Sequence, residues 1–417
     1  MTDAHFIDFQ SHWLALDRWL TALQPFWRPI PFATPTPDWE RACPGLGQWL
    51  DRLGDEEVAT YESDPAAFAE RAAAWEPRLA QRKTLVSVLA LSGPDSTLAE
   101  ANARDMPGRK RLQAGALAAA LRPLNRPVVD WCCGKGHLAR TLAAAGANPV
   151  EGLEWDKALV ADGNRLARRS GLAVTLHQQD VLAPDLAWPQ ADHGVALHAC
   201  GDLHRRLLTV GAAQGANRLS LAPCCYHRTE RTEHTPLSRQ VAADPGRCRL
   251  SRDDLRLAVQ ETVTAPGRER RQRQQVSAWR LGFDGLQRAL RARDDYLPVP
   301  SHPSRLNRGD FAGFCRWAAG NRGLALPAGV DFDHWQGHGE RRHREVRRRE
   351  LVRHLFRRPL ELWLVLDYAL YLEEQGFEVR LGTFCERALT PRNLLLDARR
   401  QGLRVAPRFT QPSRKYA

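Results

Sequence analysis

An alternation of short apolar runs and helix-like stretches between residues 126 and 225 most constrains the fold of this 417-residue chain. Five apolar runs of strand length alternate there with stretches of helical periodicity: RPVVDW, NPVEGLEW, AVTLHQQD, HGVALHAC and NRLSLAPCC. Strands that alternate with helices form parallel sheets with helices on both faces. We therefore predict an α/β fold with a doubly wound, mostly parallel sheet.

The segments on either side of this alternation have different patterns. Residues 1–104 carry apolar residues at helical spacing, interrupted by prolines, and predict a helical N-terminal cap on a core of residues 105–227. Residues 228–355 are arginine-rich and less regular, which indicates an insertion that is a candidate substrate-binding region. In residues 356–417 the helical pattern PLELWLVLDYALYLEEQG precedes the runs FEVRLGTF and NLLLDARR, which we expect to close the same sheet.

The chain is basic, with 60 Lys and Arg against 48 Asp and Glu and a formal net charge of +12. The excess is regional, because residues 263–358 hold 21 arginines and ten acidic residues. Charge of this size favours polyanionic partners. We expect the insertion to follow RNA phosphates, where charge gives affinity without sequence choice. A solvated charged surface is the alternative for these arginines.

Neither a membrane nor an oxidising compartment is indicated. No stretch reaches the ~18 apolar residues of a membrane span, and MTDAHFIDFQSHWLALDRWL lacks the basic start and apolar core of a signal peptide. We therefore expect a cytoplasmic protein without a membrane partner. The nine cysteines are then reduced, so a disulfide framework is not expected.

The turn after the first apolar run, D-W-C-C-G-K-G, has the features of a nucleotide cradle. Gly134 and Gly136 let the backbone approach a ligand closely, and the start of the next helix offers free N–H donors. Glu154 ends the second run 20 residues after Gly134, the spacing at which a carboxylate accepts hydrogen bonds from ribose hydroxyls. Asp180 ends the third run, within reach of an adenine amino group. Together they predict an adenosine ligand.

The glycine loop separates two kinds of adenosine cofactor. A dinucleotide fingerprint needs G-x-G-x-x-G, whereas this chain has cysteine at the first position and leucine at the last. S-adenosylmethionine has no pyrophosphate and tolerates a looser loop, so we favour methyl transfer over hydride transfer. Lys135, which lies between the two glycines, is either a contact of this cofactor or an ordinary exposed helix lysine. The expected cofactor contacts are Asp130, Cys132, Gly134, Lys135, Gly136, Glu154, Asp180 and His198.

Cysteines and histidines gather at the ends of the fourth and fifth runs, in HACGDL (198–203) and CCYH (224–227). Parallel strands end at one edge of a sheet, so we expect one cleft to be faced by Cys132, Cys133, Cys200, Cys224, Cys225, His198 and His227. A zinc or iron–sulfur site is one interpretation. Adjacent cysteines are not the C-x₂-C pairs that open a tetrahedral site, so we expect no metal.

Two further interpretations use the same residues differently. A thiolate can add covalently to a pyrimidine before methylation, although no proline-rich loop surrounds Cys200. Alternatively, the cysteines line a tight pocket in which Asp202, Tyr226 or His227 positions or deprotonates the acceptor. We prefer His227 as the base. The candidate catalytic residues are His227, Asp202, Tyr226, Cys200 and Cys225.

The ordered motifs MPGRK, DWCCGKGHL, HACGDL, CCYH, RPLELWLVLDYALYLEE and LTPRN resemble a methyltransferase-like family with GKGHL, HACGDL and CCYH signatures. That family includes the ribosomal RNA adenine dimethylase domain-containing proteins. The resemblance covers about 105–230 and 355–400. It implies a class I Rossmann-like methyltransferase with S-adenosylmethionine at Asp130, Gly134, Gly136 and Glu154. The GKG loop and Cys-Cys-aromatic-His ending are also similar to tRNA acceptor-stem ribose methyltransferases.

The resemblance also implies a substrate side. Arg109 and Lys110 match a basic motif that precedes the first run. Leu389–Asn393 matches a serine-proline-arginine-asparagine loop with Thr390 in place of serine, which makes Arg392 and Asn393 substrate-binding candidates.

The match to the family is incomplete in two places. Cys132 stands where many members have the first glycine of the loop, and the N-P-P-Y-type loop of adenine dimethylases is missing after the fourth run. The family label therefore leaves the substrate open. We predict an S-adenosylmethionine-dependent methyltransferase acting on RNA, either tRNA or rRNA. A non-catalytic RNA-binding scaffold and a metal-dependent Cys/His-site protein are the alternatives.

Overall fold

The computed structural model describes residues 8–260, 267–303, 306 and 309–402. The chain divides into two compact units, each built from segments that are far apart in the sequence. Unit 1 comprises Met1–Ser87, Arg231–His234 and Asp244–Leu366; unit 2 comprises Val88–Glu230, Thr235–Ala243 and Asp367–Ala417.

Unit 1 is helical in its described residues. Its elements are α1 (Phe9–Ala22), α2 (Gln24–Trp27), α3 (Trp39–Ala42), α4 (Pro44–Arg52), α5 (Asp55–Ser63), α6 (Pro65–Ala72), η1 (Pro77–Gln81), α7 (Arg82–Leu85), α13 (Arg252–Leu257), α14 (Gly267–Arg291), α15 (Phe311–Gly320) and α16 (Phe332–His354). Helix α1 begins at Asp8, whose carboxylate accepts a hydrogen bond from the Ser11 backbone N–H. Its apolar face, including Trp13 and Trp19, is buried, as helical periodicity requires.

The arginines of α16 bond within unit 1. Arg349, 9% exposed, donates to Glu40 at 2.6 Å, and Arg347 donates to Glu62 at 2.8 Å. Two more guanidinium groups donate to backbone carbonyl oxygens, Arg348 to Leu53 and Arg353 to Trp27. The N-terminal helices and the arginine-rich segment therefore form one unit, and these four arginines stabilise it.

Unit 2 is built on a sheet that has eight strands within the described residues. They are β1 (Leu89–Ala90), β2 (Val128–Trp131), β3 (Val150–Glu154), β4 (Val174–Gln178), β5 (His193–Cys200), β6 (Arg218–Cys224), β7 (Phe377–Thr383) and β8 (Leu394–Arg400). Their order is β1-β7-β8-β6-β5-β2-β3-β4. Strand β8 runs antiparallel to β6 and β7, while the other pairs are parallel. The predicted α/β fold with a mostly parallel sheet is confirmed.

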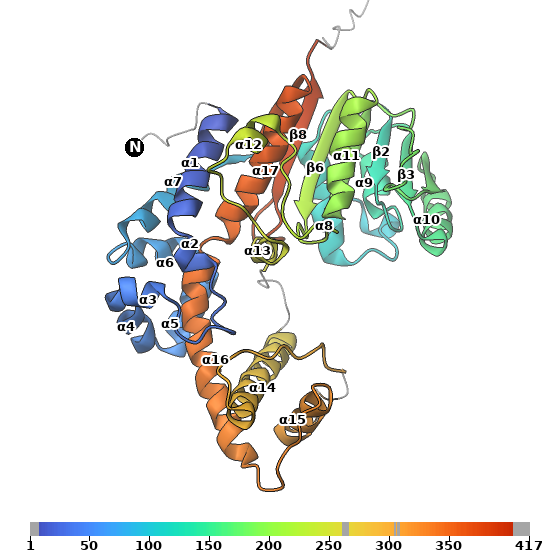
Figure 1. Ribbon diagram of the computed structural model, residues 1–417. Helices are drawn as coiled ribbons and strands as arrows, with labels where there is room; N and C mark the ends of the chain where they lie inside the picture. Colours follow the sequence, from blue (N-terminus) through green and yellow to red (C-terminus); the bar gives the residue numbers. More distant parts are fainter. Residues whose placement is uncertain (1–7, 261–266, 304–305, 307–308, 403–417) are drawn as a thin grey trace, which may run out of the picture. The chain divides into compact units, whose positions relative to one another are not determined.

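Helices flank this sheet, as Figure 1 shows for α9, α10 and α11. The helices assigned wholly to unit 2 are η2 (Glu100–Asn102), α8 (Gly108–Ala120), α9 (His137–Ala144), α10 (Lys157–Ser170), α11 (Asp202–Ala213) and α12 (Arg239–Ala243); α17 (Arg357–Glu374) has residues in both units. One apolar core joins the strands to α8 and α9 through residues such as Val128, Val195, Leu117 and Leu142. This packing fixes where the loops after the strands lie.

Strand β2 lies at the point where the strand order reverses. The chain continues from β2 to β3 on one side, and later returns through β5 on the other side. In open α/β sheets, ligands bind at such a point, beyond the carboxyl ends of the strands. The loops after β2, β3, β5 and β6 therefore define the place to look for a site.

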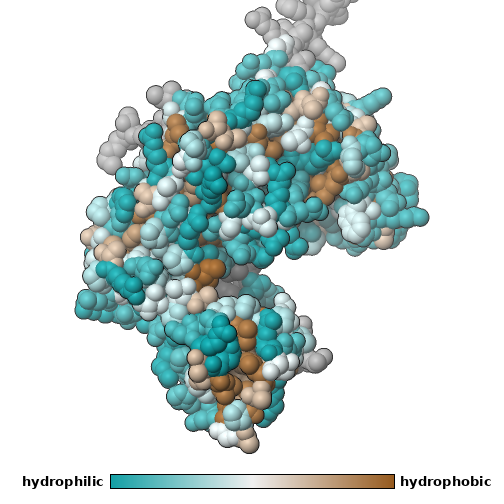
Figure 2. Space-filling model, in the orientation of Figure 1, coloured by the Kyte–Doolittle hydropathy of each residue, from teal (hydrophilic) through white to brown (hydrophobic). Residues whose placement is uncertain are grey.

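The surface and the helices agree in one respect. Within the residues that the structure describes, no helix is both long enough and apolar enough to cross a membrane. Figure 2 shows a mostly hydrophilic face with several groups of apolar atoms, one of them over the part that holds α14 and α15. That part has its own apolar core around Trp279, Phe311 and Phe314.

Candidate active site

The loop between β2 and α9 folds over the carboxylate of Asp130. This side chain is 2% exposed, and its Oδ2 accepts a hydrogen bond from the Ala139 backbone N–H at 2.9 Å. Burial raises the pKa of Asp130 to about 8, although the hydrogen bond from Ala139 opposes this and nearby Glu154 adds to it. Asp130 therefore ties the end of β2 to the first turn of α9.

Three residues of this loop have left-handed backbone angles. The φ angles are 58° at Cys132, 56° at Gly134 and 63° at Gly136, a region that favours glycine. A Cβ atom at Gly134 would meet no atom within 4 Å, so the loop is open at this point. At Gly136 a Cβ atom would lie 3.0 Å from Leu176, so the helix start packs closely on the sheet.

Glu154 connects the end of β3 to the same loop. Its Oε2 accepts a hydrogen bond from the Gly134 N–H at 2.9 Å, and its Oε1 accepts one from the Asp156 N–H at 3.1 Å. The side chain is buried within the sheet edge at 6% exposure of the residue. Next to it, Trp155 is 73% exposed, a large aromatic side chain at the strand end that the sequence analysis did not single out.

Asp180 and Cys132 are two further residues predicted to contact the cofactor. Asp180, exposed after β4, accepts a hydrogen bond from the Leu182 N–H at 2.9 Å. Burial raises the pKa of the Cys132 thiol, and the charges of Glu154, Asp130, Cys200 and Asp180 raise it further. These charges show that Cys132 lies near the acidic side chains and near Cys200 at the end of β5.

Lys135 and Cys133 point elsewhere. The Lys135 ammonium lies 2.9 Å from the carboxylate of Asp162 in α10. Cys133 packs against the apolar core, and a Cβ atom at Gly152 would lie 2.7 Å from its Sγ. The expectation that all seven cysteines and histidines face one cleft is therefore wrong for Cys133, whose thiol is directed to the sheet.

His198, predicted as a cofactor contact, is linked instead to residues of the predicted substrate side. Its Nε2 lies 3.0 Å from Oε1 of Gln113 in α8, and Nε2 of Gln113 donates to the Leu389 carbonyl oxygen at 3.1 Å. With the amide oriented this way, the His198 Nε2–H donates. Burial lowers the pKa of His198, and the charges of Arg392 and Lys110 lower it further. The sequence did not mark Gln113 as a site residue. It is a buried polar residue in an Ala- and Leu-rich helix.

The predicted basic residues lie around this link. Arg109 and Lys110 are exposed at the start of α8, and the Lys110 charge acts on both His198 and His137. Arg392 is half-buried in the loop before β8 and acts on His198 and Cys225. Asn393, the next residue in that loop, is buried.

Asn393 is 6% exposed and donates to the Cys385 carbonyl oxygen at 2.6 Å. This bond holds the loop closed across the β7–β8 connection. Its position therefore favours support of the loop that carries Arg392 over direct contact with a substrate.

The motif HACGDL fastens the end of β6 to the start of α11. Gly201 has φ 55° and ψ −119°, and a Cβ atom there would lie 1.8 Å from the Arg228 carbonyl oxygen. The Asp202 N–H donates to that same oxygen at 3.0 Å, and its carboxylate accepts from the Glu230 N–H at 3.2 Å. Asp202 therefore holds the segment that contains CCYH.

The predicted catalytic residues in CCYH lie in two environments. Tyr226 is 4% exposed and packs edge-on against His204, with ring centroids 5.6 Å apart. His204 is itself buried and lies 3.1 Å from the Tyr368 hydroxyl. His227 is half-buried, and its charge acts on the Cys225 thiol. The position of Tyr226 favours core packing, whereas His227 accompanies the cysteines.

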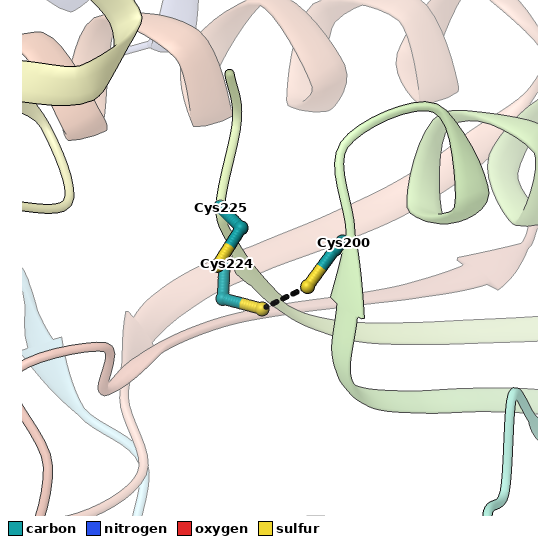
Figure 3. A group of neighbouring side chains, drawn as sticks. All are labelled: Cys200, Cys224 and Cys225. Atoms are coloured by element: carbon teal, nitrogen blue, oxygen red, sulfur yellow. Dashed lines mark hydrogen bonds between the residues drawn. The ribbon is translucent and has the colours of Figure 1, made fainter. Parts of the chain in front are cut away.

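Three thiols form the centre of the β5 and β6 strand ends. Cys200, Cys224 and Cys225 place their Sγ atoms within 4.8 Å of one another, and those of Cys200 and Cys224 are 3.5 Å apart (Figure 3). Hydrogen bonds from Cys200 and Cys224 lower the pKa of Cys225, while burial opposes this, and the pKa of Cys224 is raised. Among the three thiols, Cys225 is therefore the one whose pKa its neighbours lower.

Comparison with known proteins agrees with this geometry. Residues 117–232 match the family model described as a methyltransferase domain. The matched stretch begins in α8, contains both glycines of the loop and Glu154, and ends after CCYH. The cofactor side and the thiols thus belong to one domain.

Solved structures of methyltransferases are also similar to part of the chain. The T. thermophilus 16S rRNA N2 G1207 methyltransferase, in complex with AdoMet and guanosine, is 25% identical, with 28% of this chain and 36% of that chain covered and a TM-score of 0.23. The Pyrococcus abyssi tRNA (uracil-54, C5)-methyltransferase, in complex with S-adenosyl-L-homocysteine, is 16% identical, with 26% and 28% covered and a TM-score of 0.23. A geranyl diphosphate methyltransferase in complex with SAM is 20% identical, with 32% and 62% covered and a TM-score of 0.24. Each match spans less than two thirds of the other protein.

The residues present in the stretch that matches a methyltransferase domain fit S-adenosylmethionine, the cofactor that the sequence predicts. The loop is open at Gly134, where a side chain would otherwise project. The Glu154 carboxylate lies against the same residue and has acceptor capacity for ribose hydroxyls beyond the two backbone N–H groups it already binds. The other predicted contacts stay predictions.

Proposed function

We propose that this protein is an S-adenosylmethionine-dependent methyltransferase that acts on RNA, either tRNA or rRNA. The observation that carries the proposal is one sheet edge of unit 2 with two chemically different sides, of which the cofactor side lies in the stretch that matches a methyltransferase domain. The loop after β2 and Glu154 form an acidic side, whereas α8 and the loop before β8 bring cations and His198 to the other side. An adenosine cofactor and a phosphate-bearing acceptor suit these two sides respectively.

The chain's part in the reaction is mainly to position the reactants. The cofactor supplies an electrophilic methyl group, and transfer needs the acceptor atom in line with it. Glu154 would hold the ribose and Gly134 would allow the backbone to approach. His198, fixed by Gln113, would orient the acceptor nucleotide. His227 would take the proton that an N–H or O–H acceptor loses, which is the usual task of histidine in such a step.

The charge distribution supports RNA contacts through the start of α8, whereas four arginines of α16 are engaged within unit 1. Lys110 and Arg109 are exposed beside the site, whereas the α16 arginines 347, 348, 349 and 353 are bonded within unit 1. Phosphate contacts need accessible cations, since affinity comes from displaced counterions. We therefore assign the main phosphate contacts to Arg109, Lys110 and Arg392.

The motifs support membership of the methyltransferase-like family with GKGHL, HACGDL and CCYH signatures. The glycine of HACGDL is explained by the structure, because at position 201 only glycine fits against the Arg228 carbonyl oxygen. The link to rRNA adenine dimethylases and the cytoplasmic location stay predictions. An RNA-binding scaffold without turnover is the competing function.

Comparison of modified nucleosides tests the proposal. Total tRNA and rRNA from a deletion strain and its parent would be digested and analysed by mass spectrometry, with complementation by wild type, Glu154→Ala and Glu151→Gln. Glu151 lies on the same strand, with only a 3.9 Å pair to His177, and is the matched control. We expect one methylated nucleoside to be lost and then restored by wild type and Glu151→Gln alone. Identical nucleosides in both strains, or restoration by Glu154→Ala, would contradict a methyltransferase.

A further inference from the structure

The three thiols of Cys200, Cys224 and Cys225 converge because of two backbone irregularities. The β5–β6 register shifts between Leu197 and Cys200, which places Cys200 opposite Cys224. Neighbouring residues of a strand direct their side chains to opposite faces, but Cys225 has φ 44° and leaves that pattern. Its Sγ therefore lies within 4.8 Å of the other two, on the same side of the chain.

These distances suit one metal ion. Zinc binds thiolate sulfur at ~2.3 Å in tetrahedral sites, so two sulfur ligands of one ion are about 3.8 Å apart. The Cys200 and Cys224 sulfurs are 3.5 Å apart, and all three pairs fall within 4.8 Å. Small movements of side chains would bring the three sulfurs to the spacing of a zinc site.

We propose that Cys200, Cys224 and Cys225 bind one zinc ion as thiolates, with the fourth position taken by a water molecule. Binding forms three Zn–S bonds, and the protons of the thiols leave to solvent. The ligands come from two neighbouring strand ends, which is why no C-x₂-C pair marks the site in the sequence. This inference rests on the thiol positions alone and holds whether or not the substrate is RNA.

Metal content of the full chain is the direct test. The protein would be purified without a metal-affinity tag from zinc-supplemented medium, and zinc measured by elemental analysis per mole of protein. We expect about one equivalent in wild type and in the control Cys43→Ser, and under about a tenth in Cys200→Ser and Cys224→Ser. Cys43 is a half-buried cysteine of unit 1, which makes it a matched control.

A second readout guards against variants that fail to fold. Cobalt(II) added to the metal-free full chain would give a sulfur-to-cobalt charge-transfer band that saturates at one equivalent, and zinc would remove it. Zinc would also raise the melting temperature of wild type and Cys43→Ser but not of Cys225→Ser. No zinc and no charge-transfer band in folded wild type would overturn the site, as would equal bands in wild type and Cys225→Ser. A mass two daltons below the reduced chain, showing a disulfide between Cys200 and Cys224, would overturn it too.

Discussion

The two sides of the sheet edge in unit 2 are built in different ways. The acidic side comes from two consecutive loops, in which Gly134 and Glu154, 20 residues apart, bond directly. The opposite side needs distant segments, since His198 reaches Leu389 only through Gln113 of α8. A local motif can specify the first side, whereas the second exists only once the sheet and α8 have packed.

The same contrast applies to positive charge. The arginine-rich α16 has its guanidinium groups at 347, 348, 349 and 353 bonded to acceptors of its own unit, while Arg109 and Lys110 at α8 are exposed. A count of arginines therefore locates the densest charge without locating the accessible charge. Three predictions test these contrasts.

The largest effect is expected from a pair of glycines with similar φ angles but different surroundings. In Gly201→Ala the new Cβ would meet the Arg228 carbonyl oxygen at 1.8 Å, in a backbone conformation that only glycine adopts readily. We expect a loss of about 3–5 kcal/mol in the free energy of unfolding. In Gly134→Ala the Cβ would meet nothing within 4 Å, and we expect about 1 kcal/mol.

Urea unfolding of both variants beside wild type measures this difference. Equal losses for Gly201→Ala and Gly134→Ala would contradict the assignment of Gly201 to the close contact with Arg228. That result would also remove the physical reason for the glycine in HACGDL.

The next effect separates structural from accessible cations. Arg349→Met leaves Glu40 without its 2.6 Å partner in a largely buried pair, and we expect a loss of about 2–4 kcal/mol of stability with RNA affinity unchanged. Lys110→Gln removes an exposed charge, so stability stays within about 0.5 kcal/mol. RNA affinity then falls, and the slope of log K against log salt decreases by about 0.7–0.9.

Chemical unfolding and salt-dependent RNA binding of the two variants would be measured side by side. If Arg349→Met changes the salt slope and Lys110→Gln does not, the phosphate contacts belong to α16 as the sequence first indicated.

The effect that is smallest per step of the titration concerns the buried acid of the cofactor side. Burial raises the pKa of Asp130 from its ordinary 3.8 to about 8. The folded state therefore keeps a proton that the unfolded state releases, and this contribution to stability is complete below pH about 4 and is lost as the pH rises to about 8. In Asp130→Asn an acceptor for the Ala139 N–H remains but the titration does not. We expect the stability of wild type relative to Asp130→Asn to fall by about 1 kcal/mol per pH unit between about pH 5 and 8.

Urea titrations of both proteins at several pH values within this range give the difference directly. A constant difference would show that Asp130 does not keep its proton in the folded state.

Much of unit 2 could be predicted because β2, β3 and β5 are each followed by a helix with its own periodicity. All five central runs became β2 to β6, and the two closing runs became β7 and β8. Strand β1 was not predicted, because a strand of two residues is too short to show a periodic pattern. These residues form a strand by pairing with β7. The orientation of Cys133 was missed for a similar reason, because nothing in two adjacent cysteines says which one packs on Gly152.

The cofactor side was also more predictable than the substrate side. Gly134 and Glu154 have a characteristic spacing, and the structure joins them by a hydrogen bond. Gln113 has no such signal, because its role depends on packing between α8, β5 and the loop before β8. The arginines of α16 gave a signal of charge, but their partners, such as Glu40, lie about 300 residues earlier in the chain and were not predictable from it.

Binding of S-adenosylmethionine tests the central claim most directly. Isothermal titration calorimetry would compare the full wild-type chain with Glu154→Ala and the control Glu151→Gln. We expect wild type and Glu151→Gln to bind at micromolar protein. Glu154→Ala should bind about 10- to 150-fold more weakly, because one hydrogen bond to a charged group contributes about 1.5–3 kcal/mol. No binding by wild type, or equal binding by wild type and Glu154→Ala, would contradict the account.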